Sequence, residues 1–392
     1  MKLFPKNFLW GTAISSYQTE GNTANADWWQ WEKQHPPPDN SRCGSACDFW
    51  NRYETYIEHA AALGSRAFRI SLEWSRIQPT PTTWDEHALS QYNEIIQTIK
   101  SHNMEPVITV WHFSLPQWFA KKGGWTRSYN RGYWNAYCEK LRDTLAKDVR
   151  YWVTLNEPGA YAAMGYLTGY WPPGKHSIFK FISTLHGLIQ AHRNAYAILK
   201  NKDNHIGVSL NLSHDELVHP ANWGERFVEM ILGHYSDWGF LSYVKNRIDF
   251  LGINYYFHNQ ISWIPGKQRK RHLDKSDLRW DVCPRGMYQV MVKAYAQCKK
   301  PIFITENGVA DNHDTIRQSF IRDHIAWLHE AYKEGIPVIG YLHWSLMDNV
   351  EWQRGKQPRF GLMEMDYEHM TATPRPSFYL YQDIIKAYTE RI

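Results

Sequence analysis

The sequence predicts an α/β fold, a single (β/α)8 TIM barrel with long loops at the top of the barrel. The chain of 392 residues alternates short apolar runs with helical patterns, and eight such strand-plus-helix units follow one another. Strands that alternate with helices are typical of βαβ units and a parallel sheet. Eight units over this length fit a closed barrel, whose active site lies at the C-terminal ends of the strands.

No linker of low complexity separates the units, so we expect one domain over residues 1–392. The apolar runs predict strands at 8–13, 67–72, 106–110, 151–155, 205–210, 250–253, 301–305 and 338–342. The helical patterns cover 48–63, 86–102, 134–146, 180–200, 225–243, 286–296, 315–333 and 377–390. Asp48 is suited to cap the first of these helices, and Gly64 follows it as a stop.

A doubly wound open sheet is the structural alternative. Such a sheet usually carries a glycine-rich phosphate turn after its first strand. The stretch Gly11-Thr12-Ala13 is no such turn, so we favour the barrel.

Composition and charge weigh against several classes of protein. A net charge of +5, from 44 basic and 39 acidic residues, is too balanced to indicate a nucleic acid or another polyanion as partner. No apolar run is long enough to span a membrane. The aromatic residues are unusually many, with 20 Trp, 24 Tyr and 16 Phe. Their faces stack on sugars and also fill large cores, so this excess suits a carbohydrate ligand.

The cysteines predict the redox state. There are five of them, and the chain runs from Met1 into a strand-like segment without an apolar signal region. We therefore expect reduced thiols and a cytoplasmic protein. Cys43 and Cys47 share a loop, but no second Cys or His pair at metal-ligand spacing completes a zinc site.

Each predicted strand is followed by a group that can bond a hydroxyl, hold a charge or stack on a ring. In chain order these groups are Gln18, Arg69, His112, Asn156-Glu157, Asn211, Asn254 to Tyr256, Glu306 and Trp344. A lone Asn or His at such a place is more often a turn or capping residue. A lone Glu there is more often a solvated charge. The agreement of all eight strand ends is what indicates a site.

Two of these groups are carboxylates, which end the fourth and seventh strands. Cleavage of a glycosidic bond needs an acid that protonates the leaving oxygen and a second carboxylate opposite it. If the two lie about 5–5.5 Å apart, the second attacks the sugar and configuration is retained. Arg69 is suited to keep Glu306 ionised, and Tyr256 could donate to the same carboxylate. Glu157 would be protonated in the resting enzyme and would later act as base.

These residues belong to longer motifs that resemble those of the glycoside hydrolase family 1 β-glycosidases, the β-glucosidase family. The matching stretches run through nearly the whole chain in family order: Phe8 to Gly11, Tyr17 to Gly21, Phe68 to Ser71, Glu73 to Arg76, Thr154 to Pro158, Asn254 to Tyr256, Ile304 to Gly308, Trp344 to Asn349, Glu351-Trp352 and Arg359 to Gly361. The resemblance implies a retaining β-glycosidase, most closely a β-glucosidase, that hydrolyses unphosphorylated β-D-glycosides through a covalent glycosyl-enzyme. The implied substrate is a small β-glycoside or oligosaccharide, and neither a metal nor an organic cofactor is implied.

The resemblance also implies a role for each matching residue. Glu157 is the acid/base and Glu306 the nucleophile, and Glu306 is supported by Arg69, Asn254 and Tyr256. The residues implied to bind the substrate are Gln18, His112, Asn156, Trp344, Glu351, Trp352 and Phe360.

The implied sugar contacts are specific. Asn156 contacts the 2-hydroxyl, Gln18 and Glu351 hold the far edge of the ring, and Trp344 is the stacking floor. Relatives that cleave 6-phosphorylated sugars have a small hydroxyl residue in place of Glu351. A carboxylate there repels phosphate, so we expect an unphosphorylated sugar.

The chain also departs from the family pattern. It is shorter than most of the family, so some barrel-top loops are expected to be shortened. Gly159 stands where a Trp commonly follows the acid's proline, and Phe113 stands where a Trp often follows His112. We therefore expect an open leaving-group side and loose selection of the leaving group.

Several alternatives stay open at this point. A sugar-binding barrel without activity is one, and an enzyme that mainly transfers sugar to acceptors other than water is another. A β-galactosidase, β-fucosidase or mannosidase would use the same residues, and the sequence leaves the oligomeric state open. Trp28, Trp29 and Trp31 either wall the site or pack a loop on the barrel rim. The basic run 267–271 is interpreted as a solvated loop rather than a site for nucleic acid or an anionic surface.

Overall fold

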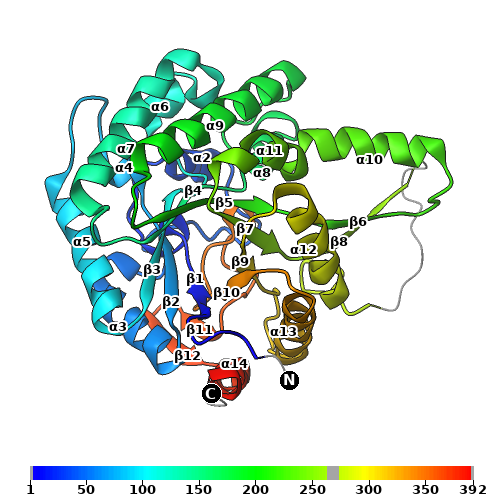
Figure 1. Ribbon diagram of the computed structural model, residues 1–392. Helices are drawn as coiled ribbons and strands as arrows, with labels where there is room; N and C mark the ends of the chain where they lie inside the picture. The colour runs from blue at the N-terminus through cyan, green and yellow to red at the C-terminus, as the bar shows by residue number, and fades with distance from the viewer. Residues whose placement is uncertain (1–2, 263–272, 390–392) are drawn as a thin grey trace.

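The computed structural model describes residues 3–262 and 273–389 and has eight parallel strands in a closed barrel (Figure 1). Around the barrel, the strands follow the order β1-β10-β9-β7-β5-β4-β3-β2, and β2 pairs with β1 to close it. They are β1 Leu9–Ala13, β2 Ala67–Ser71, β3 Glu105–Trp111, β4 Tyr151–Asn156, β5 His205–Asn211, β7 Phe250–Tyr255, β9 Ile302–Asn307 and β10 Val338–Trp344. The predicted fold class is confirmed, and every predicted strand is found.

The helices cover the outside of the barrel. These helices are α3 Phe49–Ala62, α5 Glu86–Ser101, α7 Arg131–Leu145, α9 Ile178–Leu199, α10 Trp223–Tyr235, α11 Asp237–Val244, α12 Pro284–Cys298, α13 Arg317–Lys333 and α14 Pro376–Thr389. Further helices lie in the connections between strands and these helices: α1 Ser16–Thr19, α2 Asp27–Gln34, α4 Trp74–Ile77, α6 Gln117–Lys121 and α8 Pro158–Tyr166.

The prediction of a single helix over 225–243 is wrong, because the helix is interrupted at Ser236. The backbone of Ser236 is extended (φ −96°, ψ −173°), and its hydroxyl accepts a hydrogen bond from the amide of Trp238. A serine that caps a new helix in this way ends the preceding one. The result is two helices, α10 and α11, with Asp237 in the first turn of the second.

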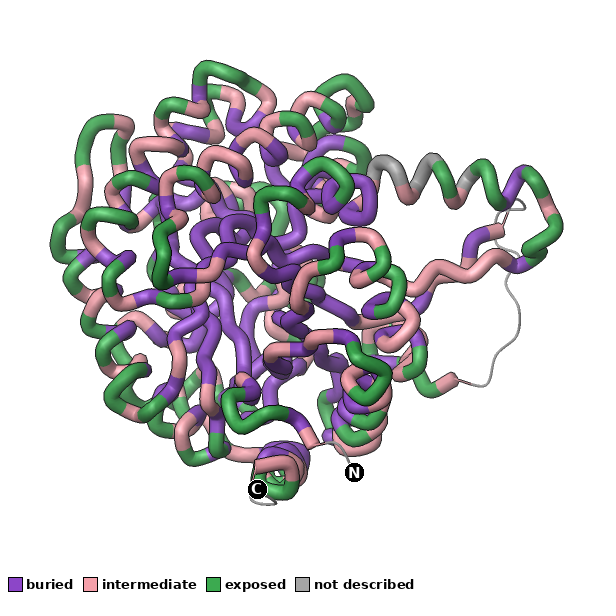
Figure 2. The backbone as a smooth tube through the Cα atoms, viewed as in Figure 1, coloured by how far each residue is buried: buried purple, intermediate pink, exposed green. Residues whose placement is uncertain are grey.

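The core has two parts. One is the ring of apolar side chains inside the barrel, such as Val107, Val153, Phe250 and Phe303. The other lies between strands and helices and contains most of the buried tryptophans. Figure 2 shows the barrel strands as the buried centre of the molecule. Because parallel strands are covered on both faces, their sequences are nearly continuous apolar runs.

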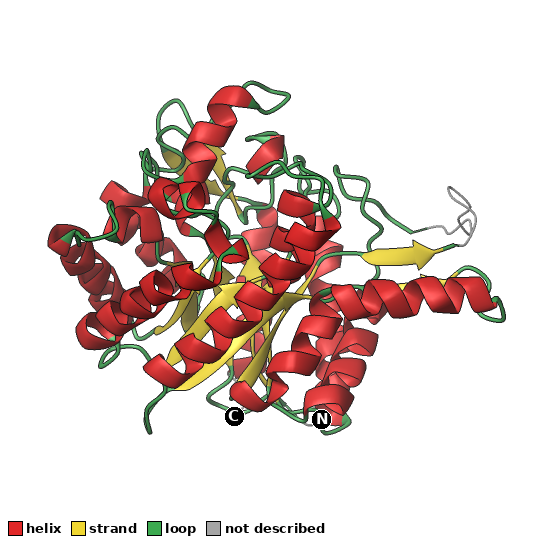
Figure 3. Ribbon diagram, turned by 90° about the horizontal axis from the view of Figure 1, so that it is seen from above, coloured by secondary structure: helices red, strands yellow, loops and turns green. Residues whose placement is uncertain are grey.

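Two small sheets were not expected from the sequence. β6 (His214–Leu217) and β8 (His258–Ile261) form a parallel pair, and β11 (Met363–Asp366) pairs with β12 (Thr371–Pro374) as an antiparallel hairpin. The β6/β8 pair and helix α10 extend away from the barrel (Figures 1 and 3). Strands of four residues carry too little periodic pattern to be recognised.

Four further expectations concern the cysteines, the Trp28 cluster, membrane helices and the basic run 267–271. All five cysteines are free thiols, and the Sγ atoms of Cys43 and Cys47 each donate to a backbone carbonyl. Trp28 is buried and packs on Trp171 and Trp352, which favours loop packing over a sugar-stacking wall. In the part of the chain that the structure describes, no helix is both long and apolar enough to cross a membrane. The basic run 267–271 lies outside the described residues.

Candidate active site

A cavity of about 310 Å³ opens at the C-terminal ends of the barrel strands. Ten of the twelve predicted site residues line it: Gln18, His112, Asn156, Glu157, Tyr256, Glu306, Trp344, Glu351, Trp352 and Phe360. The other two, Arg69 and Asn254, are fully buried beside it and reach the carboxylates. A cavity of this volume is suited to a small organic ligand.

Glu157 lies at the junction of β4 and α8. Its backbone has a positive φ of 43°, and Pro158 follows as the first residue of the helix. A left-handed conformation is unusual for Glu and is typical of functional sites. It allows the buried strand to turn directly into a helix, so that the carboxylate faces the cavity. The side chain accepts hydrogen bonds from Asn254 Nδ2 (2.7 Å) and Asn211 Nδ2 (3.0 Å).

Glu306 lies near the end of β9 and has different partners. Its Oε1 accepts from Arg69 Nη1 at 2.5 Å, and its Oε2 accepts from the Tyr256 hydroxyl at 2.6 Å. Arg69 is fully buried, so this ion pair is shielded from water. A fixed guanidinium and a hydroxyl donor both favour the ionised carboxylate.

The two carboxylates are linked through a shared set of donors. Arg69 Nη2 also donates to Asn156 Oδ1 at 2.8 Å, and Asn254 Nδ2 lies 3.1 Å from the same oxygen. Asn254 in turn reaches Glu157, and its own Oδ1 accepts from the Thr305 hydroxyl at 2.8 Å. These contacts fix the side chains at the ends of β2, β4, β7 and β9 relative to one another.

Burial and charge set the protonation states of the pair. Burial, with a contribution from the negative charge of Glu306, raises the pKa of Glu157 to about 8. Burial also raises the pKa of Glu306, but Arg69 and Tyr256 oppose this rise. Glu306 is therefore the member that stays ionised, because it contacts a positive charge whereas Glu157 contacts neutral amides. At neutral pH the proton belongs to Glu157.

The floor of the cavity presents groups suited to hydroxyls. His112 Nε2 is 3.2 Å from Asn156 Nδ2, so Nε2 accepts and Nδ1 carries the proton. Burial and the nearby Arg69 hold the pKa of His112 well below its usual range, so the ring is neutral. Its Nδ1 has no partner among the described residues. The Gln18 amide donates to Val350 O at 2.8 Å and accepts from the Ser15 hydroxyl.

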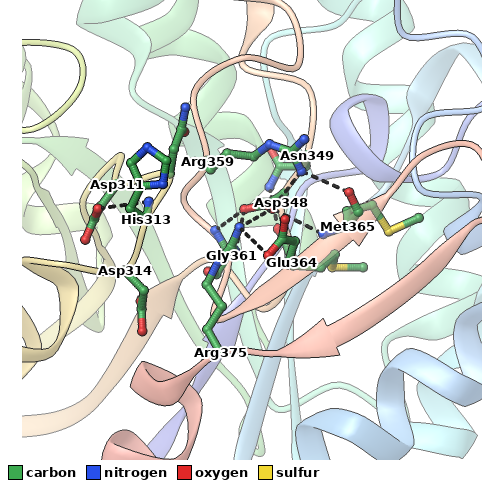
Figure 4. Close-up of polar contacts among 12 residues, drawn as sticks. Asp311, His313, Asp314, Asp348, Asn349, Arg359, Gly361, Glu364, Met365 and Arg375 are labelled. Carbon is green, nitrogen blue, oxygen red and sulfur yellow. Dashed lines mark hydrogen bonds and ion pairs between the residues drawn. The ribbon is translucent and has the colours of Figure 1, made fainter.

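Asp348 holds the loop that carries Glu351, Trp352 and Phe360. Figure 4 shows its carboxylate at the centre of several dashed contacts. The donors to it are Arg375 Nη1 and Nη2 (3.0 and 2.9 Å), Arg359 Nη1 (3.0 Å), and the amides of Gly361 (2.9 Å) and Met365 (3.2 Å). Asp348 is fully buried, so it acts as a structural anchor below the site.

Asn349, next to Asp348, connects this loop to the cavity floor. Its side chain accepts from Gln18 Nε2 at 3.1 Å and donates to the Ser345 hydroxyl at 3.0 Å. The peptide bond between Trp344 and Ser345 is cis. Glu351, which lines the cavity, has its pKa raised to about 8 by burial and by the charge of Glu306.

Gly159 is buried against Asp237, at the N-terminus of α11. Its amide donates to Asp237 Oδ1 at 2.7 Å, and a Cβ at this position would lie 2.6 Å from the same oxygen. Asp237 also accepts from the Asn211 amide, and burial raises the pKa of Asp237 to about 7. The space beside Gly159 is thus filled by a carboxylate.

The outer wall of the cavity is mainly apolar. The residues that line it beyond the predicted set are Phe113, Ala160, Ala163, Met164, Trp171, Asn211, Phe257, Trp280, Gln353 and Arg354. Of these, Asn211 was recognised as a strand end but without a role. Trp171 and Trp280 lie in loops, where no local pattern distinguishes a pocket residue from a packing one.

Comparisons with known proteins show the family of the chain. The chain matches the family described as Glycosyl hydrolase family 1 over residues 1–240 and 235–390. It is 32% identical to the 1,4-beta-D-glucan glucohydrolase of Thermotoga neapolitana, over 98% of this chain and 99% of that one.

Solved structures are similar over the same extent. A beta-glycosidase from Pyrococcus horikoshii superposes with a TM-score of 0.92 at 36% identity and covers 98% of this chain and 95% of its own. A beta-glucosidase from Thermotoga maritima gives a TM-score of 0.91 at 30% identity over 99% of both chains. Since the family match and the structural likeness both extend over nearly the whole chain, this protein belongs to glycoside hydrolase family 1.

Proposed function

We propose that the protein is a retaining β-glucosidase in which Glu157 is the acid/base and Glu306 the nucleophile. The observation that carries the proposal is the difference between the two carboxylates. Glu306 is bound by a guanidinium and a hydroxyl, whereas Glu157 is bound by neutral amides. The first environment favours a carboxylate and the second favours an acid. Double displacement requires a pair in these opposite states.

The reaction follows in two steps. Glu306 attacks C1 of the bound sugar while Glu157 donates its proton to the leaving oxygen, so the alcohol departs and a glycosyl-enzyme forms. Glu157, now a carboxylate, then removes a proton from a water molecule that attacks C1. The C1–Glu306 bond breaks, and the sugar leaves with the anomeric configuration of the substrate.

The floor groups are proposed to bind the cleaved sugar. His112 and Asn156 line the cavity, and Asn156, which is held by Arg69 and His112, is placed to contact the 2-hydroxyl. Trp344 supplies an apolar face. Glu351 also lines the cavity, and its carboxyl group is proposed to bind hydroxyls at the far edge of the sugar.

Glucose is the favoured sugar because of the relatives. Proteins named 1,4-beta-D-glucan glucohydrolase and beta-glucosidase match this chain nearly from end to end. A relative named beta-galactosidase also matches, at 28% identity. Initial rates on matched nitrophenyl β-glycosides should therefore be highest for the glucoside. A higher kcat/KM for the galactoside or fucoside would contradict the choice of glucose, but it would not contradict the two-carboxylate mechanism.

We propose that the leaving group contacts an apolar part of the cavity lining that accepts leaving groups of different kinds. Ala160, Ala163 and Met164 of α8 line the cavity there together with Phe257. Such a surface offers contact area but few directional bonds, so we expect alkyl, aryl and disaccharide β-glucosides all to be accepted. Strict selection of one leaving group in a kinetic panel would contradict this.

The roles of the two carboxylates are separable by mutation. Glu306→Gln should lower kcat for a nitrophenyl β-glucoside by about a thousandfold or more, because no covalent intermediate forms. Glu157→Gln should spare the first step with this good leaving group, which needs little protonation, and should slow release of the sugar. The exposed Glu54→Gln is the matched control and should behave as wild type. Substantial turnover by Glu306→Gln would show that Glu306 is not the nucleophile.

We also propose that the chain is a single catalytic domain and that it is located in the cytoplasm. One catalytic domain over 1–392 is supported by the closure of the barrel by its first and last strands. A cytoplasmic location is supported by the five free thiols. The ratio of transfer to hydrolysis products, measured with an added alcohol acceptor, decides whether water is the main acceptor.

A further inference from the structure

We propose that the β6/β8 pair carries a binding site for a divalent transition-metal ion, formed by His214, Glu216 and His258. The pair lies outside the cavity, on the part of the molecule that extends from the barrel (Figures 1 and 3). None of the three residues lines the cavity. The inference therefore stands independently of the proposed glucosidase activity.

Strand geometry explains how the three side chains meet. Residues two apart on a strand point to the same face, so His214 and Glu216 share one face of β6. The two strands are parallel, and His214 pairs in register with His258 of β8. Register partners also point to the same face, so the second imidazole joins the first two groups.

The distances suit a metal ion. One ligand atom from each of the three residues lies within 4.8 Å of the others, and His258 Nε2 is 3.1 Å from Glu216 Oε2. Ligand atoms of a tetrahedral zinc site lie about 3.3 Å apart, given metal–ligand bonds of about 2.0–2.2 Å. His258 and Glu216 already have nearly this spacing, and the His214 ligand atom, which lies within 4.8 Å of the others, would have to approach by at most about 1.5 Å.

Burial also favours a site rather than a surface contact. His258 is only 6% exposed, so packing holds its imidazole in place. Its Nε2 faces Glu216 and is the atom that would bind the ion. Glu216 and His214 are half-buried.

The ligand set indicates the class of ion. Two imidazoles and one carboxylate suit Zn²⁺, Co²⁺ or Ni²⁺, whereas Mg²⁺ and Ca²⁺ prefer sites made of oxygen atoms. A three-ligand protein site also leaves a position for water.

An ion here would tie together the extensions of two barrel strands. β6 follows β5, whose last residue Asn211 donates to Glu157, and β8 follows β7 and Tyr256, which donates to Glu306. On the other face of the pair, Asn259 Nδ2 donates to Asp215 Oδ1 at 3.0 Å and already joins the strands. The expected role is therefore structural: the ion stabilises the projecting pair and leaves the chemistry to the two carboxylates.

The test uses the full-length, tag-free protein after dialysis against EDTA. Titration with Co²⁺ should give the visible absorption bands of a four-coordinate site at one equivalent per chain, and Zn²⁺ should abolish them. Zn²⁺ should also raise the melting temperature. His258→Ala should weaken Co²⁺ binding by about a hundredfold, since it removes one of three ligands. The exposed His87→Ala is the matched control and should bind as wild type.

Two more variants protect the test from a folding defect. Glu216→Gln and His214→Asn keep the size and polarity of the half-buried side chains, and each should retain the wild-type circular dichroism while losing tight Co²⁺ binding. Equal Co²⁺ affinity in wild type and in these variants would overturn the proposal. So would intense near-ultraviolet absorption, which would place the ion on a cysteine thiolate instead.

Discussion

At the scale of single residues, two hydrogen-bond donors help to set the pKa of Glu157. Asn211 and Asn254 each give one hydrogen bond to it, and both bonds favour its ionised form. Burial and the charge of Glu306 outweigh them and raise the pKa to about 8. The acid is therefore poised near neutrality by opposing effects, and removal of one donor should move it.

The pH dependence of kcat/KM tests this balance. Activity requires Glu157 to be protonated, so it should fall as the pH rises through about 8. In Asn211→Leu, a donor to the ionised form is lost while water stays excluded, so the pKa of Glu157 rises and the basic limb moves to higher pH. The control Asn194→Leu changes an amide on the outer helix α9 and should leave the limb in place. A limb that moved to lower pH in Asn211→Leu would contradict the account.

All twelve residues that the sequence predicts for the site lie in or beside one cavity, because each belongs to a motif or a strand end. The sequence did not identify Asn211 as a partner of Glu157. That contact depends on β5 lying between β4 and β7, and on the register of these strands, which no local pattern encodes.

At the scale of elements, the strands and most helices were predictable because hydrophobic periodicity is local. The break at Ser236 was missed, since the apolar pattern of the two helices continues across it. The β6/β8 pair was missed because each strand is only four residues long. The effect of Gly159 also depends on tertiary structure: the neighbour that fills its space, Asp237, begins a helix far along the chain.

The packing of α8 on α11 makes Gly159 intolerant of a side chain. Gly159→Ala places a methyl group 2.6 Å from Asp237 Oδ1, so the helices must separate. We expect the free energy of unfolding to fall by about 1–3 kcal/mol, the usual effect of overpacking. Gly132→Ala on α7 is the control, because nothing lies within 4 Å of its added Cβ, and it should be neutral or stabilise by up to about 1 kcal/mol. Urea denaturation of both variants measures this, and equal stability would contradict it.

At the scale of the whole molecule, the order of the strands explains the site. β4 and β9, which deliver Glu157 and Glu306, are separated by β5 and β7 in the closed barrel. Asn211 ends β5 and Asn254 lies one residue before the end of β7, and the amides of both donate to Glu157. The strand order thus places neutral donors beside Glu157, while Arg69 of β2 donates to Glu306. The different surroundings of the two carboxylates therefore follow from the order of the strands in the barrel.

The most direct measurement is the site of covalent attachment. Cyclophellitol, which is bound in a structure of the Thermotoga maritima beta-glucosidase, is an epoxide that a carboxylate nucleophile opens. After reaction with the protein, intact-mass and peptide mass spectrometry should find one attached molecule per chain, on Glu306. Attachment to Glu157 or to another residue, or no attachment to an enzyme that hydrolyses β-glucosides, would contradict the assignment of Glu306 as nucleophile.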